Sequence, residues 1–112
     1  MRAKEKSNTR LYNLPDNVIY SLSTVTLFEL YMGATSPEKE KSIQLLTSGL
    51  NVLAFNEEIA LRSGHIYQEL KRRNQVIEFR DIFIAATSLV HGLPLATLNK
   101  KHFERIEALV LI

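Results

Sequence analysis

Three polar residues, far apart in the sequence, are of types that could together bind a divalent metal ion. Glu29 lies early in one apolar stretch, Asp81 opens a second, and Asn99 ends a short apolar run. Carboxylate and amide oxygens are the ligands that Mg²⁺ and Mn²⁺ prefer, with water and phosphate filling the remaining positions. If the fold brings these side chains together, the sequence predicts a metal site suited to phosphate chemistry.

The composition excludes several other kinds of site. The chain has 112 residues, no cysteine and a formal net charge of +2. Without cysteine it has no disulfide, no thiolate metal site and no Cys nucleophile, and the small net charge does not by itself indicate a nucleic-acid binder. No apolar run approaches the ~20 residues that a membrane span needs. We therefore expect a single soluble, cytoplasmic domain over residues 1–112.

Apolar periodicity and turn residues predict alternating strands and helices. Strands separated by helices imply a parallel sheet with right-handed crossovers, so the expected fold class is α/β. One expected helix begins near Asp81 and ends at the turn that contains Gly92. It is the fifth of the expected helices along the chain. The expected strands are residues 17–22, 51–55, 95–98 and 109–112, and the other expected helices are residues 7–14, 24–33, 37–48, 57–73 and 100–106.

This order of elements explains how the three polar residues could meet. A crossover helix runs antiparallel to the strands that it joins, so its N-terminus lies at their C-terminal edge. Asp81, near the start of its helix, and Asn99, after strand 95–98, both belong to that edge, and Glu29 follows strand 17–22 by less than two helical turns. Ligands of α/β proteins usually bind at this edge.

Each of these residues also has a purely structural interpretation. Thr26 and Glu29 have the spacing of a capping box. Asp81 could compensate the positive end of its helix, and Asn99 could be a turn residue before the next helix. The convergence of all three on one edge is what favours the metal site.

The motifs around these residues resemble the PIN domain family, and within it the VapC-type toxin ribonucleases. The matching segments are SLSTVTLFELYMGA around Glu29, FRDIFIAATSLVHGLPLAT around Asp81 and TLNKKHFERIEALVLI around Asn99. Their order and spacing match over essentially the whole chain. The resemblance implies a three-layer α/β/α fold with a central, mostly parallel sheet.

The resemblance also implies an activity and its residues. The expected protein is an Mg²⁺-dependent (or Mn²⁺-dependent) endoribonuclease, the toxin of a toxin–antitoxin pair, with RNA, an antitoxin protein and a second copy of itself as partners. By position, Glu29, Asp81 and Asn99 would be the catalytic and metal-site residues, and the hydroxyl of Thr97 would support them.

Basic residues at the same edge could contact the flanking phosphates of an RNA. The candidates are Arg80, beside Asp81, and Lys100 or Lys101, after Asn99. Single-stranded or loop RNA is the expected target because its bases are accessible.

The sequence departs from the family pattern at its N-terminus. The family begins with a strand that ends in a metal-site Asp, whereas the first Asp here, Asp16, lies in a Pro-Asp-Asn turn. We expect a late start codon, a shortened chain or a true truncation. Two functions therefore stay open: the endoribonuclease, and a catalytically impaired PIN-like module that acts through dimerisation or antitoxin binding. A phosphate-binding regulator domain is disfavoured, because the sequence has no phosphate loop.

Overall fold

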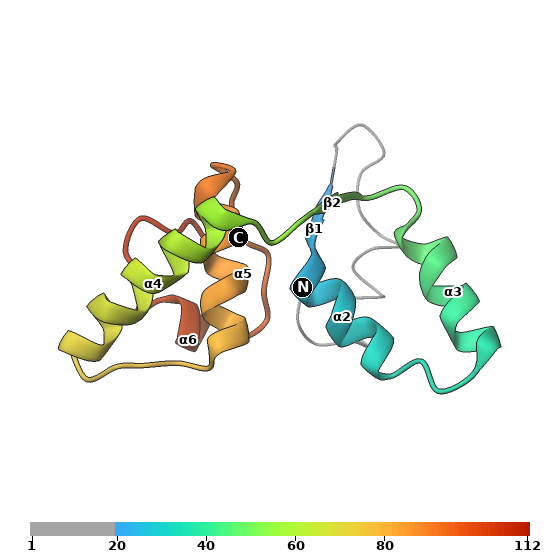
Figure 1. Ribbon diagram of the computed structural model, residues 1–112, viewed down its shortest axis with the longest axis horizontal. Coiled ribbons are helices and arrows are strands. Elements are labelled where there is room, and N and C mark those ends of the chain that lie inside the picture. The colour runs from blue at the N-terminus through green and yellow to red at the C-terminus, as the bar shows by residue number, and fades with distance from the viewer. Residues whose placement is uncertain (1–19) are drawn as a thin grey trace. The chain divides into compact units, whose positions relative to one another are not determined.

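The computed structural model describes residues 20–112, and the chain divides into two compact units (Figure 1). The units are Met1–Ala54 and Phe55–Ile112. The helix expected at residues 7–14 and residues 17–19 of the first expected strand lie outside the described residues. The expected single domain over residues 1–112 stays a prediction.

From residue 20 onward, the first unit contains a pair of parallel strands and two helices. In chain order these are β1 (Ser21–Ser23), α2 (Thr24–Met32), α3 (Pro37–Thr47) and β2 (Asn51–Leu53). β1 and β2 pair in parallel over all three of their residues. Parallel strands need a long crossover between them, which α2 and α3 provide here.

The start and the end of α2 are set by local signals. Ser23 is the N-cap, because its Oγ accepts a hydrogen bond from the backbone N–H of Thr26 at 3.0 Å. Gly33 follows the last turn and donates its backbone N–H to the carbonyl of Leu30 at 3.1 Å. The capping-box interpretation, in which Thr26 begins the helix and Glu29 closes the box, is therefore wrong. Glu29 lies in the middle of α2 and not at its start.

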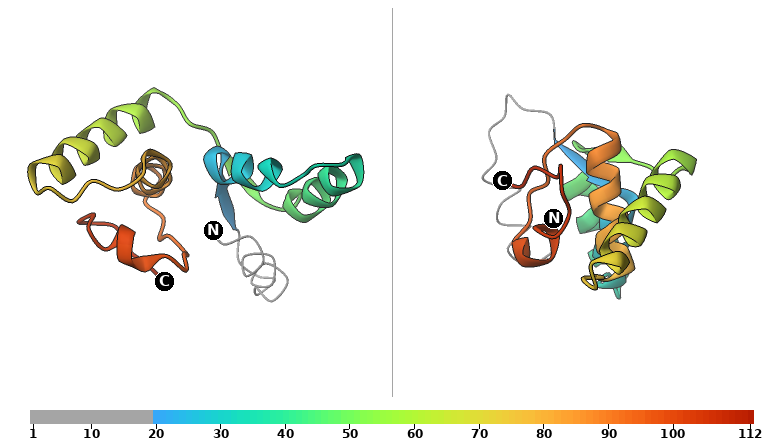
Figure 2. Two further views of the ribbon diagram at one scale, coloured as in Figure 1. Left: turned by 90° about the horizontal axis from the view of Figure 1, so that it is seen from below. Right: turned by 90° about the vertical axis from the view of Figure 1, so that its left-hand side faces the viewer.

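The second unit contains three helices and a short parallel bridge. The helices are α4 (Glu57–Arg72), α5 (Phe79–Val90) and α6 (Lys100–Phe103), and Figure 2 shows α5 between α4 and α6. Asn56 caps α4 by accepting a hydrogen bond from the backbone N–H of Ile59 at 3.0 Å. Acidic side chains in the first turn of α4 and basic ones in its last turn complement the helix dipole.

The core of the second unit forms around the apolar face of α5. Ile82, Ala85 and Ala86 of the expected inward stripe are buried, whereas Leu89 and Val90 at its end are only half-buried. The spacing i, i+3, i+4 is what places these residues on one helical face. The buried apolar side chains of this unit are Ile59, Ile66, Leu70, Ile77, Ile82, Ile84, Ala85, Ala86, Leu95, Phe103 and Ile106.

The turn after α5 redirects the chain toward α6. Gly92 has φ +64°, and its N–H donates to the carbonyl of Leu89 at 3.1 Å. The next N–H, that of Leu93, reaches back to the carbonyl of Ser88 at 2.9 Å. These paired bonds form a Schellman motif, in which glycine is favoured because it adopts a positive φ without strain. The helix therefore ends at the Gly-Leu-Pro turn, as the sequence predicts.

The last two expected strands are much shorter than the sequence predicts. Leu95 and Leu111 form a single parallel bridge, in which Leu95 donates to Val110 at 2.8 Å and accepts from Ile112 at 3.1 Å. Apolar composition indicates a buried extended segment but does not determine how many of its backbone groups find a partner. α6 is likewise shorter than the expected helix at 100–106.

The described elements bear on the expected parallel sheet and on membrane-spanning helices. Both backbone pairings found among the described residues are parallel, as expected for an α/β fold. Within residues 20–112, no helix combines the length and the apolar character that crossing a membrane requires.

Candidate functional site

Asp81 is the buried acid of the second unit. It lies in the first turn of α5, and none of its surface is exposed. Its backbone N–H donates to the carbonyl of Glu78, the N-cap residue, at 3.1 Å. A negative charge in the first turn is favoured by the helix dipole, so the dipole interpretation accounts for part of this placement. It does not account for the contact that the carboxylate makes with another helix.

That contact is with His102, on α6. Nδ1 of His102 lies 3.3 Å from Oδ2 of Asp81 and 3.0 Å from the side-chain nitrogen of Asn99. One imidazole nitrogen therefore joins two of the three residues that the sequence singles out. Asp81 and Asn99 are brought together in this structure, through His102.

Thr97 positions the backbone of Asn99. Its side-chain oxygen accepts a hydrogen bond from the backbone N–H of Asn99 at 3.0 Å. Thr97 is only 2% exposed, whereas Asn99 is half-buried. The Thr-x-Asn turn thus holds the amide side chain of Asn99 at the start of α6, where it faces His102.

His102 is a residue of this site that sequence reasoning missed. As a single histidine near basic residues it has the character of a surface side chain, and 39% of its side-chain surface is exposed. The signal that could have found it is its spacing of three residues from Asn99, which places both side chains on the same face of a helical turn.

Glu29 belongs to the first unit. It lies in the middle of α2 and is 8% exposed, so it is a buried carboxylate like Asp81. A buried acid is costly unless polar groups or a cation compensate its charge. The expected meeting of Glu29 with Asp81 and Asn99 stays a prediction.

Basic residues flank Asp81 and Asn99 along the chain. Arg80 forms an ion pair with Glu78, with Nη2 and Oε2 2.9 Å apart. Lys100 and Lys101 are exposed in the first turn of α6. The basic side chains expected near the site are therefore on the surface of this unit, where a phosphate could reach them.

The residues around His102 can be compared with the needs of a metal ion. Among residues 20–112, no three His, Cys, Asp or Glu side chains form a group that could hold a metal. Asp81 and Asn99 nevertheless offer a carboxylate and an amide oxygen, which are the donors that hard divalent ions prefer. This donor set fits such an ion in chemistry, and further ligands would have to come from elsewhere.

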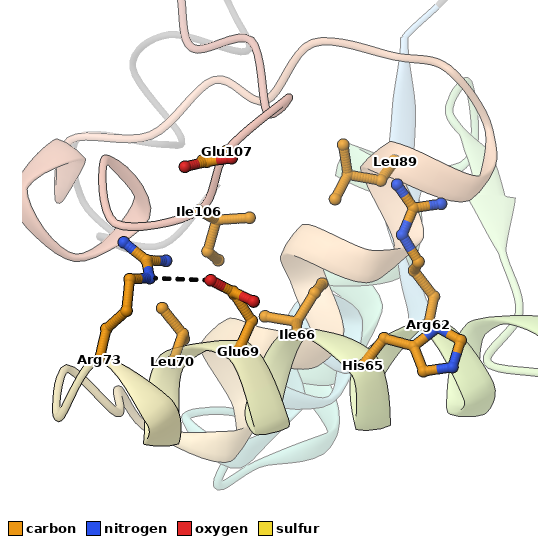
Figure 3. Close-up of a pocket in the computed structure, with 9 residues that line it drawn as sticks. All are labelled: Arg62, His65, Ile66, Glu69, Leu70, Arg73, Leu89, Ile106 and Glu107. Carbon is orange, nitrogen blue, oxygen red and sulfur yellow. Dashed lines mark ion pairs between the residues drawn. The ribbon is translucent and has the colours of Figure 1, made fainter.

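The second unit also has a pocket, which none of these site residues lines (Figure 3). Its volume is about 170 Å³. An ion pair between Arg73 Nε and Glu69 Oε2, 3.3 Å apart, lies at one side of it. The other lining residues are Arg62, His65, Ile66, Leu70, Leu89, Ile106 and Glu107.

Known proteins resemble this chain in sequence. The chain is 32% identical over 87 residues to Ribonuclease VapC1 of Methanocaldococcus jannaschii, an alignment that covers 78% of this chain and 64% of the relative. It is 35% identical to Ribonuclease VapC1 of Haemophilus influenzae strain R2866, covering 87% of this chain and 75% of the relative. The chain thus spans slightly less than two thirds of the length of the archaeal relative.

Solved structures resemble it in fold. The structure of VapBC-1 from nontypeable Haemophilus influenzae matches 93% of this chain and 81% of its own, with a TM-score of 0.80 and 34% identity. The structure of VapBC2 from Rickettsia felis bound to a promoter DNA fragment matches 96% of this chain and 84% of its own, with a TM-score of 0.81 and 25% identity. The fold is therefore PIN-like α/β, as the sequence predicts.

The family assignment rests on the length of the match as well as on these relatives. The PIN domain model matches residues 5–109, which include Glu29, Asp81 and Asn99. Because this match extends over nearly the whole sequence, the chain belongs to the PIN domain family.

Proposed function

We propose that the chain is a metal-dependent endoribonuclease, the toxin of a toxin–antitoxin pair, and that it hydrolyses RNA phosphodiester bonds. Relatives with 32% and 35% identity are ribonucleases by name. The observation that carries the proposal is the meeting of Asp81 and Asn99 around His102. It gathers a buried carboxylate and an amide from separate elements at one place.

The metal would be Mg²⁺ or Mn²⁺. Its ligands would be Glu29, Asp81 and Asn99, two carboxylates and an amide, as the positions of these residues in the family motifs imply. When bound, such an ion activates a water molecule and neutralises charge on the phosphate.

The chain itself would keep the donor groups in place. Burial limits the motion of the Asp81 carboxylate, and the Thr97 hydroxyl fixes the backbone from which the Asn99 side chain extends. Holding reacting groups in position before the substrate binds removes part of the entropic barrier to reaction.

The exposed basic residues would bind the RNA. Lys100 and Lys101 extend from the first turn of α6, directly after Asn99. Arg80 adjoins Asp81 in the chain and could exchange its ion pair with Glu78 for a phosphate. We expect single-stranded or loop RNA as substrate, since the bases of a duplex are not accessible to side chains in this way.

The partners would be an antitoxin protein and a second copy of the chain. The structures of VapBC-1 and of VapBC2 are the basis for the antitoxin partner. A homodimer and a cytoplasmic location complete the proposal, as expected for a toxin that acts on cellular RNA.

The first test is the substitution Asp81→Asn, measured on a fluorescently labelled RNA in Mg²⁺ or Mn²⁺. Asparagine keeps the size of the side chain but removes its charge, so we expect cleavage to be abolished. EDTA added to the unsubstituted chain should have the same effect, and restored Mg²⁺ should reverse it. Circular dichroism checks that the variant is folded.

The matched control is Glu58→Gln, which removes the charge of an exposed acid on α4. We expect this variant to cleave RNA at the rate of the unsubstituted chain. Cleavage that continues undiminished in Asp81→Asn, or in EDTA, would overturn the metal-dependent mechanism.

A further inference from the structure

Nδ1 of His102 has two neighbours that make incompatible demands on it. The side-chain nitrogen of Asn99 is 3.0 Å away and the carboxylate oxygen Oδ2 of Asp81 is 3.3 Å away. An amide nitrogen can only donate a hydrogen bond, and a carboxylate oxygen can only accept one. A single ring nitrogen carries either a hydrogen or a lone pair, so it cannot satisfy both neighbours in this arrangement.

If Nδ1 accepts from the nearer neighbour, Asn99, its lone pair also faces Oδ2 of Asp81. Two electron-rich atoms 3.3 Å apart then lack a hydrogen between them, and one of them belongs to a carboxylate that is almost completely buried. A cation bound to both atoms would remove this conflict. The alternative is an Nδ1–H group that donates to Asp81, with the Asn99 amide turned so that its oxygen faces the ring.

The separation of the two atoms suits a shared metal ion. Neighbouring ligands of an octahedral Mg²⁺ ion, whose bonds are about 2.0–2.1 Å long, lie ~2.9 Å apart. The 3.3 Å between Nδ1 and Oδ2 is longer and fits a cation with longer bonds. Imidazole nitrogen is also a ligand that transition-metal ions accept more readily than Mg²⁺ does.

We infer that His102 Nδ1 is itself a metal ligand, which with Asp81 Oδ2 and the amide oxygen of Asn99 forms a mixed nitrogen–oxygen site that takes Mn²⁺ in preference to Mg²⁺. The inference rests on the proposed metal-dependent function and makes its site more specific. Once Nδ1 binds the ion, the Asn99 amide must turn, because its N–H no longer has an acceptor there. The turn brings the amide oxygen to the ion as the third donor.

The test is pulsed EPR of Mn²⁺ added to the full chain, because this method detects nitrogen nuclei bonded directly to the ion. We expect a coupling from one imidazole nitrogen in the unsubstituted chain. The substitution His102→Gln keeps a polar side chain but removes the ring nitrogen, so the coupling should disappear. The Mn²⁺ affinity measured by calorimetry should fall by more than the ~10–100-fold that losing a hydrogen-bonding partner of a metal ligand typically costs, because a direct ligand is lost. The Mg²⁺ affinity should change little.

The matched control is His91→Gln. His91 is exposed at the end of α5, where its backbone rather than its side chain makes the capping bonds. This variant should keep both the imidazole coupling and the Mn²⁺ affinity. The spectrum of the unsubstituted chain tests the inference by itself, even if His102→Gln fails to fold.

Two results would overturn the inference, and they differ in what they say of the proposed function. Mn²⁺ binding that Asp81→Asn weakens, but that shows no imidazole coupling, would make His102 a hydrogen-bonding partner of Asp81 and leave the nuclease proposal standing. No Mn²⁺ binding at all, together with RNA cleavage that EDTA does not affect, would overturn both.

Discussion

Helix α4 and the segment from Leu95 to Ile112 are held in place in opposite ways. α4 follows the cap residue Asn56, whose side chain accepts a hydrogen bond from the N–H of Ile59, three residues later. The helix continues for 16 residues. The segment at 95–112 has one four-residue helix and a single backbone bridge. It is linked to Arg73, just after α4, through the carbonyl of Arg105, and to Asp81 of α5 through His102. Local signals thus set where α4 begins and ends, whereas distant residues determine the position of the segment that carries Thr97, Asn99 and His102.

The largest effect should come from removing the main anchor of that segment, in the variant Phe103→Ala. Phe103 is fully buried in α6, next to His102 in the chain. Replacing a buried phenylalanine by alanine removes apolar contacts and leaves a cavity, so we expect a loss of about 3–5 kcal/mol in the free energy of unfolding. Urea denaturation followed by circular dichroism measures it.

Phe79→Ala is the matched control for this prediction. Phe79 is 62% exposed at the start of α5 and makes an edge contact with Tyr67, with ring centroids 5.8 Å apart. Its loss should lower the free energy of unfolding by only about 0.5–1.5 kcal/mol. Equal losses in the two variants would show that the segment does not depend on Phe103.

A smaller effect is expected where the two regions meet, in the variant Arg73→Ala. The guanidinium of Arg73, just after α4, donates to the carbonyl oxygen of Arg105 and pairs with Glu69. In return, Arg105 donates to the carbonyl of Gln75 at 3.4 Å. Hydrogen bonds from a charged group contribute about 1.5–3 kcal/mol when well buried. Because these groups are partly exposed, we expect the free energy of unfolding to fall by ~1 kcal/mol. Amide exchange at Ile106 should become faster.

The neighbouring variant Arg72→Ala tests whether this effect comes from the link to the distant segment. Arg72 also pairs with Glu69, but its side chain is 68% exposed, and exposed ion pairs contribute about 0–1 kcal/mol. We expect amide exchange at Ile106 to be unchanged in this variant. Faster exchange in both variants would assign the effect to the loss of charge instead.

The same contrast explains what the sequence could predict of the fold. Asn56, Pro37 and Gly92 are strong local signals, and each lies at or next to a helix end in the structure. The parallel pairing of the strands follows from the alternation of elements and is also found. The predicted length of the strand that begins at Leu95 is wrong. That length depends on how closely the residues near Leu111 approach Leu95, and no local sequence pattern encodes this approach.

One feature of the candidate site could be predicted from the sequence, and another could not. The nearness of Asp81 and Asn99 could be predicted, because the order of elements places both residues at one edge of the expected sheet. The contact of His102 with Asp81 could not be predicted. A histidine three residues after Asn99 has the same spacing whether it faces solvent or a buried acid. Only the burial of Asp81 and the orientation of α6 distinguish the two cases.

The smallest effect should come from a purely local change, Asn56→Ala. This substitution removes the side-chain oxygen that accepts from the N–H of Ile59, and loss of such a cap costs about 1 kcal/mol. We expect faster amide exchange in the first turn of α4 and no change in exchange at residues 95–112, measured by hydrogen exchange and NMR. The control Gln68→Ala, at an exposed position of the same helix, should leave both regions unchanged, because alanine favours helix at least as well as glutamine. If Asn56→Ala also accelerated exchange around Leu95 and Ile106, α4 would not be locally determined, and the contrast between the two regions would fail.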